Sequence, residues 1–235
     1  MRVSSVTRRL AGQGGAKWQV HFRANAMAAE GRDVIRLTIG EPDVPAPDTL
    51  QQAATEAMRA GRTGYSNGRG EAGLRRTLAE HYARTRGRPF TPDQVMCFPG
   101  TQTALYAVMA AVAEEGCEVL VGDPMYATYE GVIRATGADM VPVPLDPARG
   151  FRIAAEDIAA RVTPRSRAIL LTTPHNPTGA VLTGADIAEI GAVARAHDLW
   201  IIADEVYEEM VFDGVRFASP LAGPDLADRV IAVSS

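Results

Sequence analysis

The chain has 235 residues, of which 46% are hydrophobic and 22% charged, and its formal net charge at pH 7 is −4. This length and composition suit one large α/β domain, or one domain and part of another. The acidic balance argues against a nucleic-acid partner or an anionic membrane surface, and no apolar run reaches transmembrane length. Two cysteines and four scattered histidines form no metal-binding pattern, so we expect no metal site. These features predict a soluble, cytoplasmic protein.

The N-terminal part of the chain is predicted to contain loops and helices around a single strand. Apolar residues recur with helical spacing from Leu50 to Met58, and Gly61 ends this run. The stretch "TGYSNGRG" has the composition of a loop. In chain order the expected elements are a mobile arm over 1–17, a helix over 18–31, a strand over 33–40, the helix from Leu50, a loop over 63–70 and a helix around 74–82.

From residue 95 onward the predicted strands and helices alternate, which indicates a mostly parallel sheet with helices on both faces. Segments such as "AILLTT" and "LWIIAD" are continuously apolar, as strands buried on both faces are. The expected strands are 95–98, 118–121, 139–143, 167–172, 199–203 and 229–233, and the expected helices or long connections are 102–115, 125–136, 154–161 and 184–197. In such sheets ligands bind beyond the carboxyl ends of the strands, so the chemistry is expected in the loops that follow them.

Two of these loops carry groups that suit a phosphate and a planar ring. In "PGTQT" the chain turns at Gly100, and a helix opens at Thr101 whose free N–H groups and positive dipole end can bind a phosphate. An ordinary helix cap is the alternative. In "GDPMYATYEG", Tyr126 could stack on a planar ligand, or it could be a core tyrosine.

Two further loops carry an amide and a carboxylate. The turn "PHNPTG" holds the amide of Asn176 outward, and this uncommon hexapeptide favours a functional role over a plain turn. Asp204 directly follows the apolar strand "WIIA", so its carboxylate either caps the next helical turn or pairs with a ligand cation. Tyr207, three residues later, could reach the same ligand. One pocket with these groups would fit a phosphorylated pyridine aldehyde.

The motifs resemble the class I and II aminotransferases, the aspartate aminotransferase-like branch (fold type I) of the pyridoxal 5′-phosphate (PLP) enzymes. The similarity runs from about Trp18 to Ser235 and rests on "TIGEPD", "YSNGRGEAGLR", "PGTQTALYAV", "DPMYATYEG", "PHNPTGAV" and "IIADEVYEEM". Within the family, "AKWQVHFRA" and "DPMYATYEG" are most similar to the arginine–pyruvate transaminases. The resemblance implies that residues 1–44 form an N-terminal arm and small-domain segment, and that residues 45–235 form an incomplete large PLP-binding domain.

The resemblance implies roles around the cofactor ring. Tyr126 would stack on the pyridine ring, and Asn176 and Tyr207 would hydrogen-bond its phenolic oxygen. Asp204 would pair with the pyridine nitrogen and keep it protonated.

The resemblance also assigns the cofactor phosphate. Gly100, Thr101 and Gln102 would bind it together with Ser235. Tyr65 would reach the phosphate of the neighbouring subunit's cofactor, which implies a homodimer.

The substrates implied by the resemblance are an L-amino acid and a 2-oxo acid, and Gly40 would contact the substrate carboxylate. The Schiff-base lysine of the family would lie three residues after Ser235, beyond residue 235, so no catalytic residue is assigned and the chain as given is expected to be inactive alone. The sole lysine, Lys17, lies outside every strand-end loop and is not expected to replace it. The alternatives are a PLP-dependent β-lyase or decarboxylase on the same scaffold, or an inactive truncated PLP-binding fragment.

Overall fold

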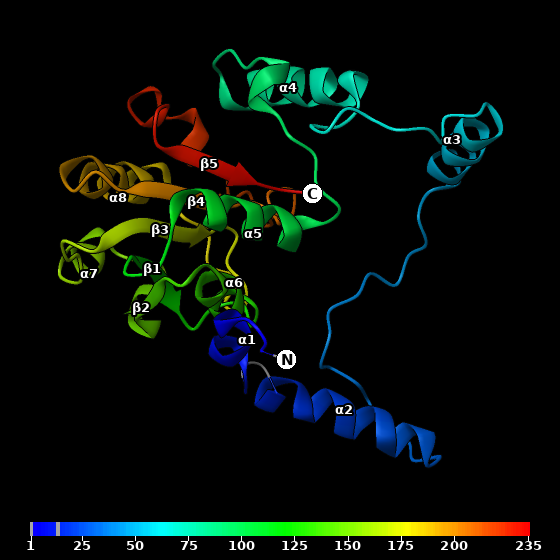
Figure 1. Ribbon diagram of the computed structural model, residues 1–235, viewed down its shortest axis with the longest axis horizontal. Coiled ribbons are helices and arrows are strands. Elements are labelled where there is room, and N and C mark those ends of the chain that lie inside the picture. The colour runs from blue at the N-terminus through cyan, green and yellow to red at the C-terminus, as the bar shows by residue number, and fades with distance from the viewer. Residues whose placement is uncertain (1, 13–14) are drawn as a thin grey trace.

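A computed structural model describes residues 2–12 and 15–235 and contains a five-stranded parallel sheet in the order β2-β1-β3-β4-β5, with α2 (Gly15–Ala29) and α3 (Asp48–Arg59) lying away from it (Figure 1). The strands are β1 (Glu118–Asp123), β2 (Asp139–Pro144), β3 (Ser166–Thr172), β4 (Trp200–Asp204) and β5 (Val230–Val233). Asp204 is in register with Thr172 on one side and Val233 on the other, so three carboxyl ends lie side by side. The predicted parallel α/β sheet is confirmed.

Helices cover both faces of this sheet. Val121 and Leu170 point to the face covered by α5 and α6, whereas Leu120 and Ile169 point to the face covered by α7 and α8. Successive strand residues point to opposite faces, so the continuously apolar strands contribute to both cores at once. The helices are α1 (Ser5–Leu10), α2 (Gly15–Ala29), α3 (Asp48–Arg59), α4 (Ala72–Arg86), α5 (Thr101–Val112), α6 (Tyr129–Thr136), α7 (Ala155–Ala159) and α8 (Gly184–Ala196).

The predicted mobile arm over residues 1–17 is wrong in part. It contains α1, which the Ser4 hydroxyl caps and which packs against α6, and it also contains the first turn of α2. Residues 1, 13 and 14 and the side chain of Lys17 lie outside what the structure describes.

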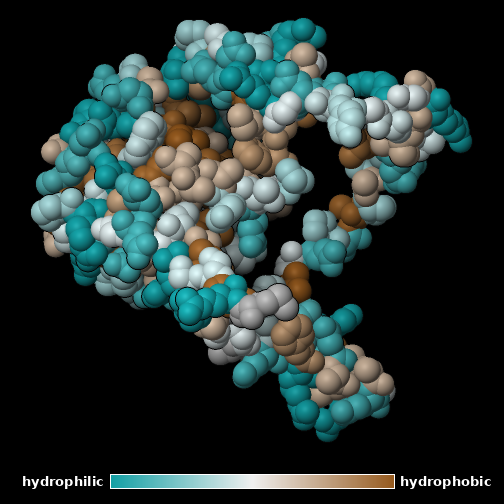
Figure 2. All heavy atoms as spheres, viewed as in Figure 1, coloured by the Kyte–Doolittle hydropathy of each residue, from teal (hydrophilic) through white to brown (hydrophobic). Residues whose placement is uncertain are grey.

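The strand predicted over residues 33–40 is absent. This segment is extended, but Ile35 and Leu37 are 86% and 90% exposed, and no neighbouring strand in the described chain offers hydrogen-bond partners. The segment runs clear of the sheet toward α3 (Figure 1), and Figure 2 shows isolated hydrophobic residues along it. Helices α3 and α4 confirm the two helices expected next, and Gly87 ends α4 in the left-handed conformation, with φ 68°.

The strand predicted over residues 95–98 is also absent, because its backbone has other partners. The N–H of Cys97 donates to the carbonyl of Arg69 at 2.9 Å. The buried guanidinium of Arg75 donates to the carbonyls of Val95 at 2.9 Å and Pro92 at 2.6 Å. A loop and a buried arginine therefore replace the expected ladder at this segment.

Within residues 2–12 and 15–235, no helix has the length and apolarity needed to cross a membrane. The same residues contain no group of three or more His, Cys, Asp or Glu side chains arranged to hold a metal ion.

Candidate functional site

Asp204 is the last residue of β4 and lies at the carboxyl edge of the sheet. Its residue exposure is 4%. The Tyr129 hydroxyl donates to Oδ2 at 2.7 Å, and the Val206 N–H donates to Oδ1 at 3.3 Å. Burial raises the pKa of the Asp204 carboxyl, and these two hydrogen bonds lower it in part. Among the described residues no cationic side chain pairs with this carboxylate, so its partners are a phenol and one amide.

Tyr129 is the functional candidate that the motifs did not identify. It begins α6 and is buried, and its hydroxyl lies 2.7 Å from both Asp204 Oδ2 and Thr172 Oγ1. Because its only proton goes to the carboxylate, the Thr172 hydroxyl donates to the Tyr129 oxygen. Burial and the nearby Asp204 raise the pKa of Tyr129, so the phenol stays protonated. The one available signal was the spacing "YATY", which places a second tyrosine in the first turn after Tyr126.

Tyr126 lies three residues before Tyr129, in the loop between β1 and α6. Its ring packs edge-to-face on Tyr129, with ring centroids 5.6 Å apart and an interplanar angle of 75°. The residue remains 38% exposed, so part of its ring is open to a ligand. Tyr126 therefore contacts the residue that holds Asp204.

Asn176 and Tyr207, which were expected to reach one ligand atom, lie in contact with each other. Asn176 follows β3 and Tyr207 follows β4, and Nδ2 of Asn176 donates to the Tyr207 hydroxyl oxygen at 2.9 Å. The nearby His175 closes the turn by a 2.7 Å contact between its Nδ1 and the hydroxyl of Thr178. Burial lowers the pKa of His175, so this turn carries a neutral imidazole at pH 7.

The N-terminus of α5 presents free backbone donors. Gly100 precedes the helix with φ 91° and ψ 149°, a conformation that a side chain would strain. In the described chain, the N–H groups of Thr101 and Gln102 have no hydrogen-bond acceptor. The side chain of Gln102 lines a cleft of about 390 Å³, together with Trp18 of α2 and Thr128.

The two serines after β5 have different environments. Ser234 is half-buried, and its hydroxyl contacts Oε1 of Glu208 at 3.1 Å and the carbonyl of Glu205 at 3.4 Å. Ser235 is exposed and makes no hydrogen bond with the other described residues.

Two predicted site residues lie away from the sheet edge. Gly40 is in the extended segment between α2 and α3, and Tyr65 is fully exposed between α3 and α4. Neither makes a hydrogen bond within the described residues, so their expected roles in binding substrate and a second cofactor stay predictions.

A family model, a curated relative and solved structures that match this chain all describe aminotransferases. Residues 32–235 match the family model described as aminotransferase class I and II. An arginine–pyruvate transaminase of Pseudomonas aeruginosa is 44% identical over 235 residues, which are all of this chain and 60% of the relative.

Two solved structures share the fold along the whole chain. An aspartate aminotransferase from Thermus thermophilus with maleate has a TM-score of 0.92 and 31% identity. An N-succinyldiaminopimelate aminotransferase from Mycobacterium tuberculosis has a TM-score of 0.88 and 37% identity. Each match covers 100% of this chain and 60% of the solved chain, so this chain spans about 60% of the length of these relatives.

Proposed function

This chain belongs to the class I and II aminotransferases, and we propose that its protein is a PLP-dependent transaminase that moves an amino group between an L-amino acid and a 2-oxo acid. The observation that carries the proposal is the buried carboxylate of Asp204, which has no cationic partner among the described residues. An uncompensated buried charge is costly, so a positive ligand group is its expected partner. A protonated pyridine nitrogen, as in PLP, supplies that charge.

The remaining groups at this edge fit the rest of the cofactor. The Tyr207 oxygen accepts from Asn176, and its own proton has no acceptor in the described chain, so it is free to donate to the phenolic oxygen of the ring. The free N–H groups of Thr101 and Gln102 suit the phosphate. The open face of Tyr126 suits the ring itself.

When bound, PLP supplies an aldehyde that takes up the substrate's amino group and a ring that accepts the electrons of the broken Cα bond. In the proposed site, Asp204 would pair with the ring nitrogen and keep it protonated, and the hydrogen bond from Tyr129 favours the ionised form of Asp204 and orients it. Burial of both side chains excludes water and so strengthens the charge pair. Asn176 and Tyr207 would hold the phenolic oxygen of the ring.

The finer assignments are also proposals. Residues 45–235 would form the large domain, and Tyr65 would reach across a homodimer to the phosphate of the second subunit's cofactor. Ser235 would complete the phosphate site, and Gly40 would contact the substrate carboxylate. The similarity to an arginine–pyruvate transaminase favours arginine and pyruvate as the first substrate pair to test. A cytoplasmic location is proposed from the sequence features alone.

Product analysis of the full-length protein tests this function. The protein is loaded with PLP and given L-arginine with pyruvate, and then a panel of other amino donors. A transaminase yields the 2-oxo acid of the donor and one equivalent of L-alanine from pyruvate. Release of CO2 without a new amino acid would indicate a decarboxylase, and release of ammonia from a β-substituted amino acid would indicate a β-lyase.

A further inference from the structure

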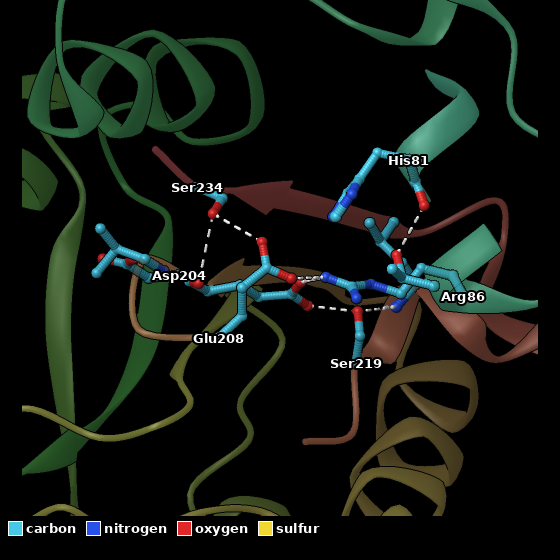
Figure 3. A network of polar contacts seen from close by, with 10 residues as sticks. His81, Arg86, Asp204, Glu208, Ser219 and Ser234 are labelled. Atoms are coloured by element: carbon cyan, nitrogen blue, oxygen red, sulfur yellow. Dashed lines mark hydrogen bonds and ion pairs between the residues drawn. The ribbon is translucent and has the colours of Figure 1, made fainter. Parts of the chain in front are cut away.

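The residue after Asp204 belongs to a buried cluster of two carboxylates and one guanidinium (Figure 3). Arg86, the last residue of α4, donates to Oε2 of Glu205 at 3.0 Å and also to Oε2 of Glu208. The Ser219 hydroxyl donates to the other oxygen of Glu205 at 2.5 Å. The side chain of Glu205 is 0% exposed and that of Arg86 is 5% exposed. The two acids therefore share one cation, and the side chain of Glu208, at 12% exposed, is the member nearest to solvent.

Aromatic rings surround the guanidinium and keep the cluster dry. The guanidinium carbon of Arg86 lies 5.3 Å from the ring centre of Tyr82 and 5.1 Å from that of Phe217. Among the described residues, its Nε has no hydrogen-bond partner. Desolvation of this kind offsets most of the attraction in a buried ion pair, so net stability alone is a weak reason for the cluster. A role in fixing geometry is the better-supported alternative.

The cluster connects the ends of the two strands that carry the proposed cofactor contacts. The N–H of Glu205 donates to the carbonyl of Val233 at 2.8 Å, which joins β4 to β5. The Ser234 hydroxyl is 3.4 Å from the carbonyl of Glu205 and 3.1 Å from Oε1 of Glu208. Asp204 is adjacent in sequence to Glu205, a member of the cluster. Ser235 is adjacent to Ser234, whose hydroxyl contacts the cluster.

We propose that Arg86, Glu205 and Glu208 are positioning residues that fix the separation between the Asp204 carboxylate and the backbone of Ser235, so that one rigid ligand reaches both. This inference rests on the proposed function, because the ring nitrogen and the phosphate of PLP are held apart by a rigid ring. Glu208 joins the two sides, since it bonds both Arg86 and Ser234. Its carboxylate is therefore the most informative position to change.

The test uses the full-length protein and pyridoxamine 5′-phosphate, a probe that binds without a covalent bond to the protein. The probe carries ¹⁵N in its ring, and its ³¹P and ¹⁵N resonances report the phosphate and ring-nitrogen ends separately. The variant is Glu208→Gln. The matched control is Glu118→Gln, which alters a buried glutamate at the opposite end of the sheet that bonds Thr163 at 2.5 Å and Arg165.

We expect Glu208→Gln to weaken binding of the probe by about 10-fold, near the lower end of the effect of a lost hydrogen bond to a charged group, because Glu208 acts on the site through its neighbours. Both resonances of the bound probe should move. Glu118→Gln should leave the affinity and both resonances unchanged, even if it lowers the melting temperature as much as Glu208→Gln does. Ser234→Ala removes a single hydroxyl from the same cluster and should shift the resonances in the same direction by less.

Equal affinities and identical spectra for Glu208→Gln and Glu118→Gln would overturn the inference and leave the proposed function standing. If Glu208→Gln does not fold, unchanged resonances in Ser234→Ala would overturn it in the same way. A wild-type protein that fails to bind the probe, or binds it with an unprotonated ring nitrogen, would overturn the proposed function and the inference together.

Discussion

Replacing Tyr129 with phenylalanine isolates the hydrogen bond that holds Asp204. The change removes one hydroxyl and leaves the ring in place, so packing in the surrounding core is retained. The lost bond is 2.7 Å long and joins a phenol to a buried carboxylate. Bonds to charged groups contribute about 1.5–3 kcal/mol, and Thr172 also loses its 2.7 Å partner, so we expect a loss of about 2–4 kcal/mol in unfolding free energy at pH 7.

The same substitution should also affect binding. The hydrogen bond from Tyr129 lowers the pKa of Asp204, so its loss lets burial raise that pKa further. A higher pKa favours the neutral carboxylic acid, whereas pairing with a pyridinium requires the carboxylate. Affinity for pyridoxamine 5′-phosphate should fall by about 10-fold, the equivalent of about 1.4 kcal/mol.

Urea unfolding and calorimetric titration of the full-length protein measure both effects. Tyr126→Phe is the matched control, because that hydroxyl makes no hydrogen bond within the described residues and its ring is partly exposed. The control should change stability by less than about 0.5 kcal/mol. If Tyr129→Phe costs no more than the control, Tyr129 does not support Asp204 and the reasoning is wrong.

Three further predictions concern Asp204, Glu205 and the position three residues after Ser235. Asp204→Ala should lower the transamination rate at least about 100-fold but weaken binding of pyridoxamine 5′-phosphate far less, and a rate within threefold of wild type would make Asp204 only a helix cap. Burial raises the pKa of Glu205 to about 7 from 4.5, so the folded state holds a proton that the unfolded chain releases, and stability falls as pH rises through that window, by roughly 3 kcal/mol in all. Urea unfolding at pH 4.5 and 7.5 should show this fall in stability in wild type and not in Glu205→Gln. If both proteins lose the same unfolding free energy between the two pH values, groups other than Glu205 cause the fall. Sequencing of the gene should place a lysine codon three positions after Ser235, and any other residue there would contradict the assignment of that serine.

Local pattern was sufficient to predict elements for which the fold supplies the expected partners. The spacing from Leu50 to Met58 gives α3, a helix whose hydrogen bonds lie within the segment. The apolar run before Asp204 gives β4, because β3 and β5 pair with it on both sides. Residues 33–40 have the composition of a strand as well, but a strand also requires a neighbour to pair with, and the described chain supplies none. Composition reports the propensity of a segment and carries no information about its partner.

The candidate site also contains residues that local sequence identifies and residues whose role depends on distant contacts. Asp204, Asn176 and Tyr126 were found because each lies at the end of a predicted strand or in the loop that follows one, and parallel strand ends meet at one edge. Tyr129 was missed because its partner Asp204 is 75 residues away in the sequence.

The cluster of charges beside Asp204 was missed for the same reason. Arg86 and Glu205 are 119 residues apart, and each looks like an ordinary surface charge when read alone. Such contacts follow from the position of Arg86, which places the end of α4 beside the residues after β4, and no local motif records that.

The most direct test of the central claim is a crystal structure of the full-length protein with pyridoxamine 5′-phosphate. We predict that the ring nitrogen lies within about 3 Å of a carboxylate oxygen of Asp204, as a charge-assisted hydrogen bond requires. The phosphate should lie against the N–H groups of Thr101 and Gln102. A ligand bound elsewhere, or a ring nitrogen that faces solvent while Asp204 contacts only Tyr129 and Val206, would contradict the account.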